Sequence, residues 1–168
     1  MAKGGRGKAK GSAYERSVCK RLSLWISHGQ SEDLFWRSAM SGGRATVAAK
    51  SGKRLDRQAG DISATSREGH ALTDFYYVEL KAYRHLAIDS FLIKNTGILV
   101  QFWQVALREA RRYNRSPLLI VKQNNMPELV IMRTGPHTRF SNLMRVLLRT
   151  ARYDIVLLSD FLAHPYKG

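Results

Sequence analysis

The chain has 168 residues, which is enough for one domain with an apolar core that needs no disulfide bonds. Lysine and arginine number 28 against 13 aspartate and glutamate residues, which gives a formal net charge of +15. This charge favours a polyanionic partner such as DNA, although a membrane surface or a ribosome would attract it too. The single cysteine, Cys19, excludes a disulfide framework or a cysteine-rich zinc site within one chain and fits a reducing compartment.

Neither a signal peptide nor a membrane span is predicted. No apolar run follows the N-terminus, and charges interrupt every apolar stretch well short of the roughly 18 residues that a spanning helix needs. We expect a cytoplasmic protein near the nucleoid, or in the host cytoplasm if a virus encodes it, with no membrane partner. Residues 1–11 mix glycine with positive charge and predict a flexible tail that binds DNA phosphates. Its basic residues are Lys3, Arg6, Lys8 and Lys10.

The first helix is predicted to begin at Ser12. Ser12 can act as its N-cap, with Glu15 three residues later as in a capping box. The helix should extend to about His28, where Gly29 ends it. Its apolar residues recur at helical spacing and are Tyr14, Val18, Leu22, Trp25 and Ile26.

A long basic loop is predicted over residues 41–60, after a short strand at residues 34–39. The loop lacks an apolar period, and its charges are interpreted as phosphate contacts. These charges are Arg44, Lys50, Lys53, Arg54 and Arg57.

The rest of the chain alternates strands and helices. Two strands, at residues 61–65 and 75–83, should form a hairpin through a turn at residues 67–70. The further predicted elements are a helix at 101–113, strands at 118–121 and 128–132, a helix around 140–148 and a strand at 155–158. This order predicts one α/β domain over residues 12–168, with a mixed central sheet flanked by helices and a helix–strand extension at 137–168.

The strand at residues 75–83 carries the residues with chemical potential. Its two-residue period places Glu79 and Lys81 on one face, about 7 Å apart along the backbone. If Asp61 lies on a neighbouring strand, its carboxylate can meet that of Glu79 and the two can hold Mg²⁺, or Mn²⁺ in its place. Such a cation can activate water for attack on a phosphodiester, with Lys81 orienting or deprotonating the water or stabilising charge. The alternatives are a solvated Glu79–Lys81 ion pair and a turn at Asp61.

Several segments in order resemble the archaeal-type Holliday junction resolvases of the PD-(D/E)xK nuclease superfamily. The resemblance covers about residues 10–123 and implies a restriction-endonuclease-like fold. The segments are residues 10–16, Trp36-Arg37, Ser41-Gly42, Gly60-Asp61-Ile62, Val78-Glu79-Leu80-Lys81, Gln104, residues 110–113 and residues 117–122.

The resemblance implies roles for individual residues. Asp61 and Glu79 would be the metal ligands, with Lys81 beside them. Glu15 would reach the same site from the first helix, and Ser41 would lie near the scissile phosphate. The alternatives are that Glu15 is only the capping-box residue and that Ser41 is only part of a turn.

Further positions follow from the same resemblance. Arg16 and Arg37 would contact DNA or steady the site. Gln104 would face the site from its helix, although a buried or a surface amide is the more common role of such a residue. The tryptophans are expected in the core and not as base-stacking platforms; they are Trp25, Trp36 and Trp103.

The chain departs from the resolvase pattern in three places. Gly60 stands where the superfamily name has proline, residues 41–60 are longer than expected, and nothing after about residue 135 corresponds. We expect a Mg²⁺-dependent, structure-selective DNA endonuclease that needs no small-molecule cofactor. It would cut four-way junctions as a homodimer, because a two-fold substrate needs two matched cuts. The alternatives are another PD-(D/E)xK specificity (a nickase, a restriction or a packaging-associated enzyme) and a non-catalytic DNA-binding protein.

Overall fold

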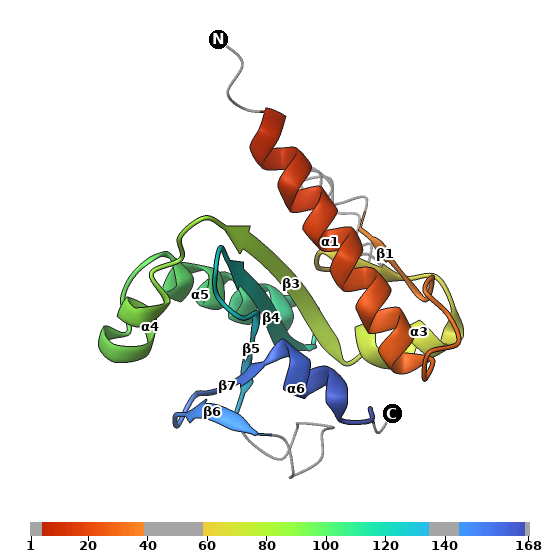
Figure 1. The fold of residues 1–168 in the computed structure, drawn as a ribbon. Coiled ribbons are helices and arrows are strands. Elements are labelled where there is room, and N and C mark those ends of the chain that lie inside the picture. The colour runs from red at the N-terminus through yellow and green to blue at the C-terminus, as the bar shows by residue number, and fades with distance from the viewer. Residues whose placement is uncertain (1–4, 39–58, 135–144, 167–168) are drawn as a thin grey trace.

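The computed structural model describes residues 5–38, 59–134 and 145–166, with side chains from Lys10 onward. Helices separate groups of strands along this chain, and four of the described strands follow one another before the last helix (Figure 1). The elements are α1 (Gly5–Ile26), β1 (Phe35–Arg37), β2 (Ile62–Ala64), α3 (Arg67–Thr73), β3 (Tyr76–Tyr83), α4 (Ile88–Lys94), α5 (Ile98–Arg112), β4 (Ser116–Gln123), β5 (Leu129–Arg133), β6 (Val146–Arg149), β7 (Tyr153–Leu157) and α6 (Leu158–Ala163).

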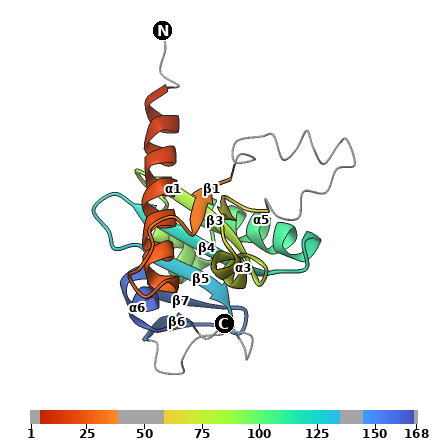
Figure 2. The same ribbon diagram turned by 90° about the vertical axis from the view of Figure 1, so that its right-hand side faces the viewer.

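The core of the fold is a five-stranded mixed sheet in the order β3-β4-β5-β7-β6. Strands β3 and β4 are parallel and are connected through α4 and α5, whereas the remaining neighbours are antiparallel. Helices α1, α3 and α6 pack on one face of the sheet, and α4 and α5 pack on the other. Figure 2 shows α1 and α5 on opposite sides of the strands. The predicted α/β class, a mixed sheet flanked by helices, is confirmed.

Strand β4 shows why the sheet needs helices on both faces. Its apolar run from Leu118 to Val121 is fully buried, because alternate side chains enter the two opposite cores. Leu118 and Ile120 face α1, and Leu119 and Val121 face α5. Strand β3, at the end of the same sheet, has only one strand neighbour. Its free edge is therefore open to the segment that precedes β2.

Helix α1 begins at Gly5, seven residues before the predicted start at Ser12. Residues 5–11 therefore belong to the helix and not to a tail, and residues 1–4 lie outside the described residues. Ser12 lies in the helix interior, so the predicted capping box is absent. The arginine, lysine and alanine residues before Ser12 are strong helix formers, and they extend the helix despite its glycines.

The predicted hairpin is wrong, although the strands exist. Strand β2 pairs antiparallel with β1, where Trp36 is opposite Ser63, and not with β3. Residues 67–70 belong to helix α3, because the hydroxyl of Ser66 accepts a hydrogen bond from the backbone N–H of Gly69 and caps the helix. Glu68 in the first turn further favours this helix.

The predicted helix around residues 140–148 is also corrected. Residues 135–144 lie outside the described residues, and Val146–Arg149 form strand β6, paired with β7. Val146 and Leu148 are half-buried while Leu147 is exposed, so a two-residue period prevails over the helical one. The described C-terminal part is therefore strand, strand and helix α6. Within the described residues, no helix is long and apolar enough to cross a membrane.

Candidate active site

Three side chains of β3 form the centre of the candidate site. Tyr77, Glu79 and Lys81 lie on the face that α5 covers, because they alternate with the buried Val78 and Leu80. The Lys81 ammonium forms an ion pair with the Glu79 carboxylate, and its Nζ lies 3.8 Å from Oδ2 of Asp61. The predicted shared face of Glu79 and Lys81 is confirmed, and both carboxylates meet the same ammonium.

Asp61 reaches this centre by docking on the free edge of β3. Its backbone N–H donates to the carbonyl of Val78 at 2.9 Å, and its Oδ2 accepts from the N–H of Leu80 at 2.8 Å. The N–H of Ser38, just after β1, donates to the carbonyl of Asp61 at 2.8 Å. Two backbone hydrogen bonds thus hold Asp61 in place and a third orients its carboxylate, and they replace the hairpin pairing that the sequence led us to expect.

Gly60 makes this docking possible. Its φ angle is +91°, and a Cβ at this position would lie 2.5 Å from the carbonyl oxygen of Val78. Proline cannot adopt this conformation, since its ring holds φ near −65°. The glycine in place of the proline of the superfamily name therefore has a structural reason.

The surroundings of Asp61 and Lys81 raise the pKa of both side chains. Burial, followed by the negative charge of Glu79, raises the pKa of Asp61 to about 7, against the opposing effects of Lys81 and of the Leu80 N–H. Burial acts to lower the pKa of Lys81, but Glu79 and Asp61 outweigh it and raise that pKa above its usual value. The lysine is therefore held in its charged form between two carboxylates.

Tyr77 positions the second carboxylate. Its hydroxyl donates to Oε2 of Glu79 at 3.2 Å, and its ring stacks on that of Tyr113. Burial, followed by the charge of Glu79, raises the pKa of Tyr77 well above its usual range. The hydroxyl thus stays a donor. Tyr77 was not singled out from the sequence. Its position two residues before Glu79 could have identified it, because the two-residue period of a strand places both side chains on the same face.

The donor set fits a hard divalent cation. Asp61 and Glu79 supply carboxylate oxygens on the two sides of Lys81. Burial, followed by the charge of Glu79, raises the pKa of Asp61, and a bound cation would offset both effects by stabilising the ionised carboxylate. Among the described residues, no group of three or more histidine, cysteine, aspartate or glutamate side chains could hold a metal. Water and a substrate phosphate could supply further oxygen ligands.

Glu15 lies close to this centre on α1. Its carboxylate forms an ion pair with the guanidinium of Arg37 and adds to the negative charge that raises the pKa of Asp61. Arg16, the next residue, is exposed and lines a separate pocket together with Arg37. The structure thus brings Glu15 to the site from the first helix and ties it to β1.

A basic cleft borders the site. Lys10, Arg84 and Lys122 line a cleft of about 590 Å³ whose wall includes Glu15 and Lys81. Arg84 and Lys122 were not singled out from the sequence, because their approach depends on the pairing of β3 with β4, in which Ala82 is opposite Lys122. Such a cleft can follow a phosphate backbone.

Some of the predicted residues are not placed at the site. The exposed Gln104 lines a hollow with Trp103, Arg111 and Tyr153, on the flank of α5 opposite to Phe102, whose ring lies under Lys81. Arg6 and Lys8 belong to α1, but the structure does not describe their side chains. Also outside the described residues are Lys3, Ser41, Arg44, Lys50, Lys53, Arg54 and Arg57.

An α/β fold with an aspartate, a glutamate and a lysine at the sheet edge defines the class of PD-(D/E)xK nucleases. The chain matches the family described as "Phage putative PDDEXK endonuclease" over residues 6–157, and it belongs to that family. No curated protein matches the chain. Among solved structures, Hjc from Archaeoglobus fulgidus, a Holliday junction resolvase from an archaeal hyperthermophile, is 14% identical. The match covers 93% of this chain and 95% of that one, with a TM-score of 0.32.

Proposed function

We propose that the protein is a Mg²⁺-dependent endonuclease that hydrolyses phosphodiester bonds in DNA at the centre formed by Asp61, Glu79 and Lys81. The observation that carries this proposal is the placement of one ammonium between two carboxylates at the sheet edge, with Nζ of Lys81 3.8 Å from Oδ2 of Asp61. Family membership supports the nuclease chemistry.

Each residue of the centre has a distinct part in the proposed reaction. Asp61 and Glu79 would hold the cation, which when bound supplies Lewis-acid activation of water and neutralises phosphate charge. The Leu80 N–H and the Tyr77 hydroxyl fix the orientation of these carboxylates. Lys81 donates hydrogen bonds to the phosphate and stabilises the negative charge that grows on its oxygens.

Substrate DNA would enter along the basic cleft. Lys10 and Arg84 are charged groups of this cleft for which the described residues provide no carboxylate partner. They can therefore neutralise phosphates beside the scissile bond without first breaking an ion pair. Arg37 would keep Glu15 next to the centre.

We further propose that the preferred DNA is branched and that the enzyme acts as a homodimer. The support is the resemblance of the ordered motifs from residue 10 to residue 123 to those of junction resolvases. A two-fold dimer would hold two copies of the active site at a fixed separation, so that two strands of a symmetric junction could be cut. Cleavage mapping on labelled four-way junction, flap, nicked and linear DNA at one salt concentration tests this. Equal rates on all four would leave the nuclease and remove the branch selectivity.

The place of action that we propose is the cytoplasm of the cell that contains the DNA, a bacterial host if the gene is viral as the family description suggests. The formal charge of +15 would hold the protein on nucleic acid there.

A plasmid assay tests the catalytic proposal. Supercoiled plasmid incubated with the protein should become nicked in Mg²⁺ and stay intact in EDTA. DNA that is bound in a gel-shift assay but never cut, with Mg²⁺ or Mn²⁺ present, would instead support a non-catalytic DNA-binding protein.

A further inference from the structure

Trp36 contradicts the expectation that all three tryptophans lie in the core. Trp25 and Trp103 are buried, at 9% and 3% exposed, but Trp36 is 65% exposed. The apolar surface of an indole ring that stays in water does not stabilise the fold, and exposed tryptophans are common where a partner covers the ring. Trp36 lies on β1 next to Arg37, the partner of Glu15.

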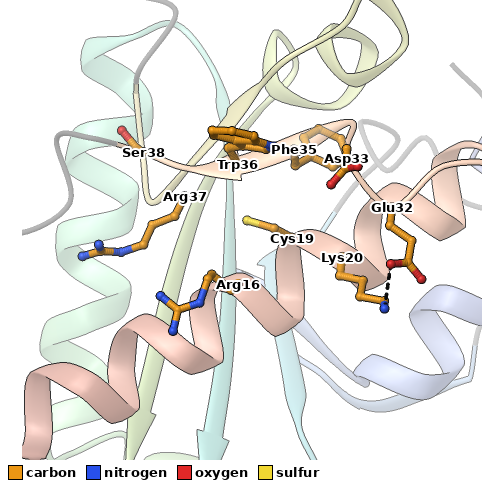
Figure 3. A pocket seen from close by; sticks show the side chains of 9 residues that line it. All are labelled: Arg16, Cys19, Lys20, Glu32, Asp33, Phe35, Trp36, Arg37 and Ser38. Carbon is orange, nitrogen blue, oxygen red and sulfur yellow. Dashed lines mark ion pairs between the residues drawn. The ribbon is translucent and has the colours of Figure 1, made fainter.

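A pocket of about 470 Å³ lies beside this ring, between α1 and β1 (Figure 3). We call it the Trp36 pocket. Arg16, Cys19 and Lys20 contribute from one face of α1, since they are three and four residues apart. Its volume is within the roughly 300–1,000 Å³ of ligand pockets.

The lining combines apolar and charged groups in the way that a nucleotide requires. Cys19 and Phe35 are buried and form an apolar floor of the pocket. Lys20 is engaged by Glu32 at 2.7 Å, as the dashed line in Figure 3 shows. The guanidinium of Arg16, in contrast, has no carboxylate partner among the described residues. Arg16 can therefore bind a phosphate while the ring of Trp36 stacks on a base.

The pocket is next to the candidate active site. Arg37 lines the pocket and forms the ion pair with Glu15, and Ser38, which also lines it, donates its backbone N–H to the carbonyl of Asp61 at 2.8 Å. Trp36 is thus two residues from a direct hydrogen bond to Asp61. A base held at Trp36 would belong to a nucleotide close to the scissile phosphate.

We propose that the Trp36 pocket binds one unpaired DNA base, stacked on Trp36, with the adjoining phosphate on Arg16. This inference rests on the proposed nuclease function and adds a substrate determinant to it. A base inside a duplex is stacked and paired and would have to be extruded, whereas a base at a branch or in a single strand costs less to place there. The pocket would therefore favour DNA with unpaired nucleotides over intact duplex.

The experiment measures binding of the full chain in EDTA, so that no DNA is cut. Two oligonucleotides carry 2-aminopurine at the same position, unpaired in a forked DNA and paired in a linear duplex. Wild-type protein should quench the unpaired probe on binding. Trp36→Ala should abolish this quenching and weaken binding to the fork by about 5- to 150-fold, the loss expected for one base stacked on an aromatic ring. Binding to the duplex should change less than twofold.

Two variants keep the outcome interpretable. Trp36→Phe retains an aromatic face and should restore much of the affinity for the fork, while Ile93→Ala, which removes another exposed apolar side chain on α4, should leave both affinities unchanged. Unchanged fork affinity in Trp36→Ala, or an equal loss on fork and duplex, would overturn the proposal. Plasmid nicking by the wild type in Mg²⁺ tests the nuclease function separately, so the two failures are distinguishable.

Discussion

Gly60 lies so close to Val78 that a Cβ on the glycine would be 2.5 Å from the valine carbonyl oxygen. This contact, at the free edge of β3, is what allows the next residue to hydrogen-bond to the strand with both its backbone and its carboxylate. The geometry of the candidate site therefore depends on a position without a side chain.

Gly60→Ala should destabilise the protein and reduce cleavage, because the substitution adds a clash with β3 to a left-handed φ angle of +91°. The φ angle alone should cost about 1–3 kcal/mol. Gly29→Ala is the matched control, since Gly29 has a φ angle of +85° and nothing within 4 Å of the added atom. In urea unfolding, Gly60→Ala should lose clearly more stability than Gly29→Ala. Equal losses in the free energy of unfolding would show that the close approach of Gly60 to Val78 does not contribute to stability.

Tyr77→Phe should lower the nicking rate about 10- to 100-fold, as is usual when a group that orients a metal ligand is removed. The variant should also need more Mg²⁺ for half-maximal rate, because Glu79 loses the hydroxyl that fixes it. Tyr153→Phe, which removes the hydroxyl of another buried tyrosine on the far side of α5, is the control and should cut normally. A Tyr77→Phe enzyme with wild-type Mg²⁺ dependence would contradict the positioning role.

The contribution of Asp61 to the stability of the metal-free protein should fall as the pH rises from about 4 to about 7. An aspartate carboxyl in the unfolded chain has an ordinary pKa of 3.8, and burial, then Glu79, raises the pKa of Asp61 to about 7 in the folded protein. Between these values the folded state binds more protons than the unfolded chain, so raising the pH removes stability, by at most about 1.4 kcal/mol per pH unit. Above about pH 7 this contribution should level off.

Urea unfolding in EDTA of wild type and Asp61→Asn, from pH 4 to pH 8, isolates this effect. The difference between the two curves should follow the predicted slope. Added Mg²⁺ should stabilise the wild type increasingly as the pH rises, since the cation binds the ionised carboxylate. Parallel pH curves for the two proteins would show that Asp61 titrates normally.

Basic residues of the cleft should determine how strongly salt weakens DNA binding. Lys10→Gln and Arg84→Gln should each reduce the slope of log affinity against log salt by about one, because each removes one phosphate contact. Lys94→Gln, at the end of α4 and also exposed, is the control and should leave the slope unchanged. Wild-type slopes in both cleft variants would mean that DNA follows another path.

The sequence predicted those parts of the site that depend on local pattern. The alternation in β3 gives Glu79 and Lys81 a common face, and the apolar periods give α5 and the buried strands. The docking of Asp61 on the free edge of β3 could not be predicted from the sequence, because it depends on the φ angle of Gly60 and on a contact between segments far apart in the chain. The same holds for β6, where pairing with β7 overrides a helical pattern, and for Trp36, whose exposure depends on how β1 packs beside α1.

The nicking rate of Glu79→Gln on supercoiled plasmid in saturating Mg²⁺ tests the central claim most directly. This substitution keeps the size of the side chain and removes the charge that, with Asp61, would hold the cation. Circular dichroism and gel-shift binding should match the wild type, while the rate should fall at least about 100-fold, as expected on loss of a group essential to transition-state stabilisation. A folded Glu79→Gln protein that nicks plasmid at the wild-type rate would contradict the assignment of this centre.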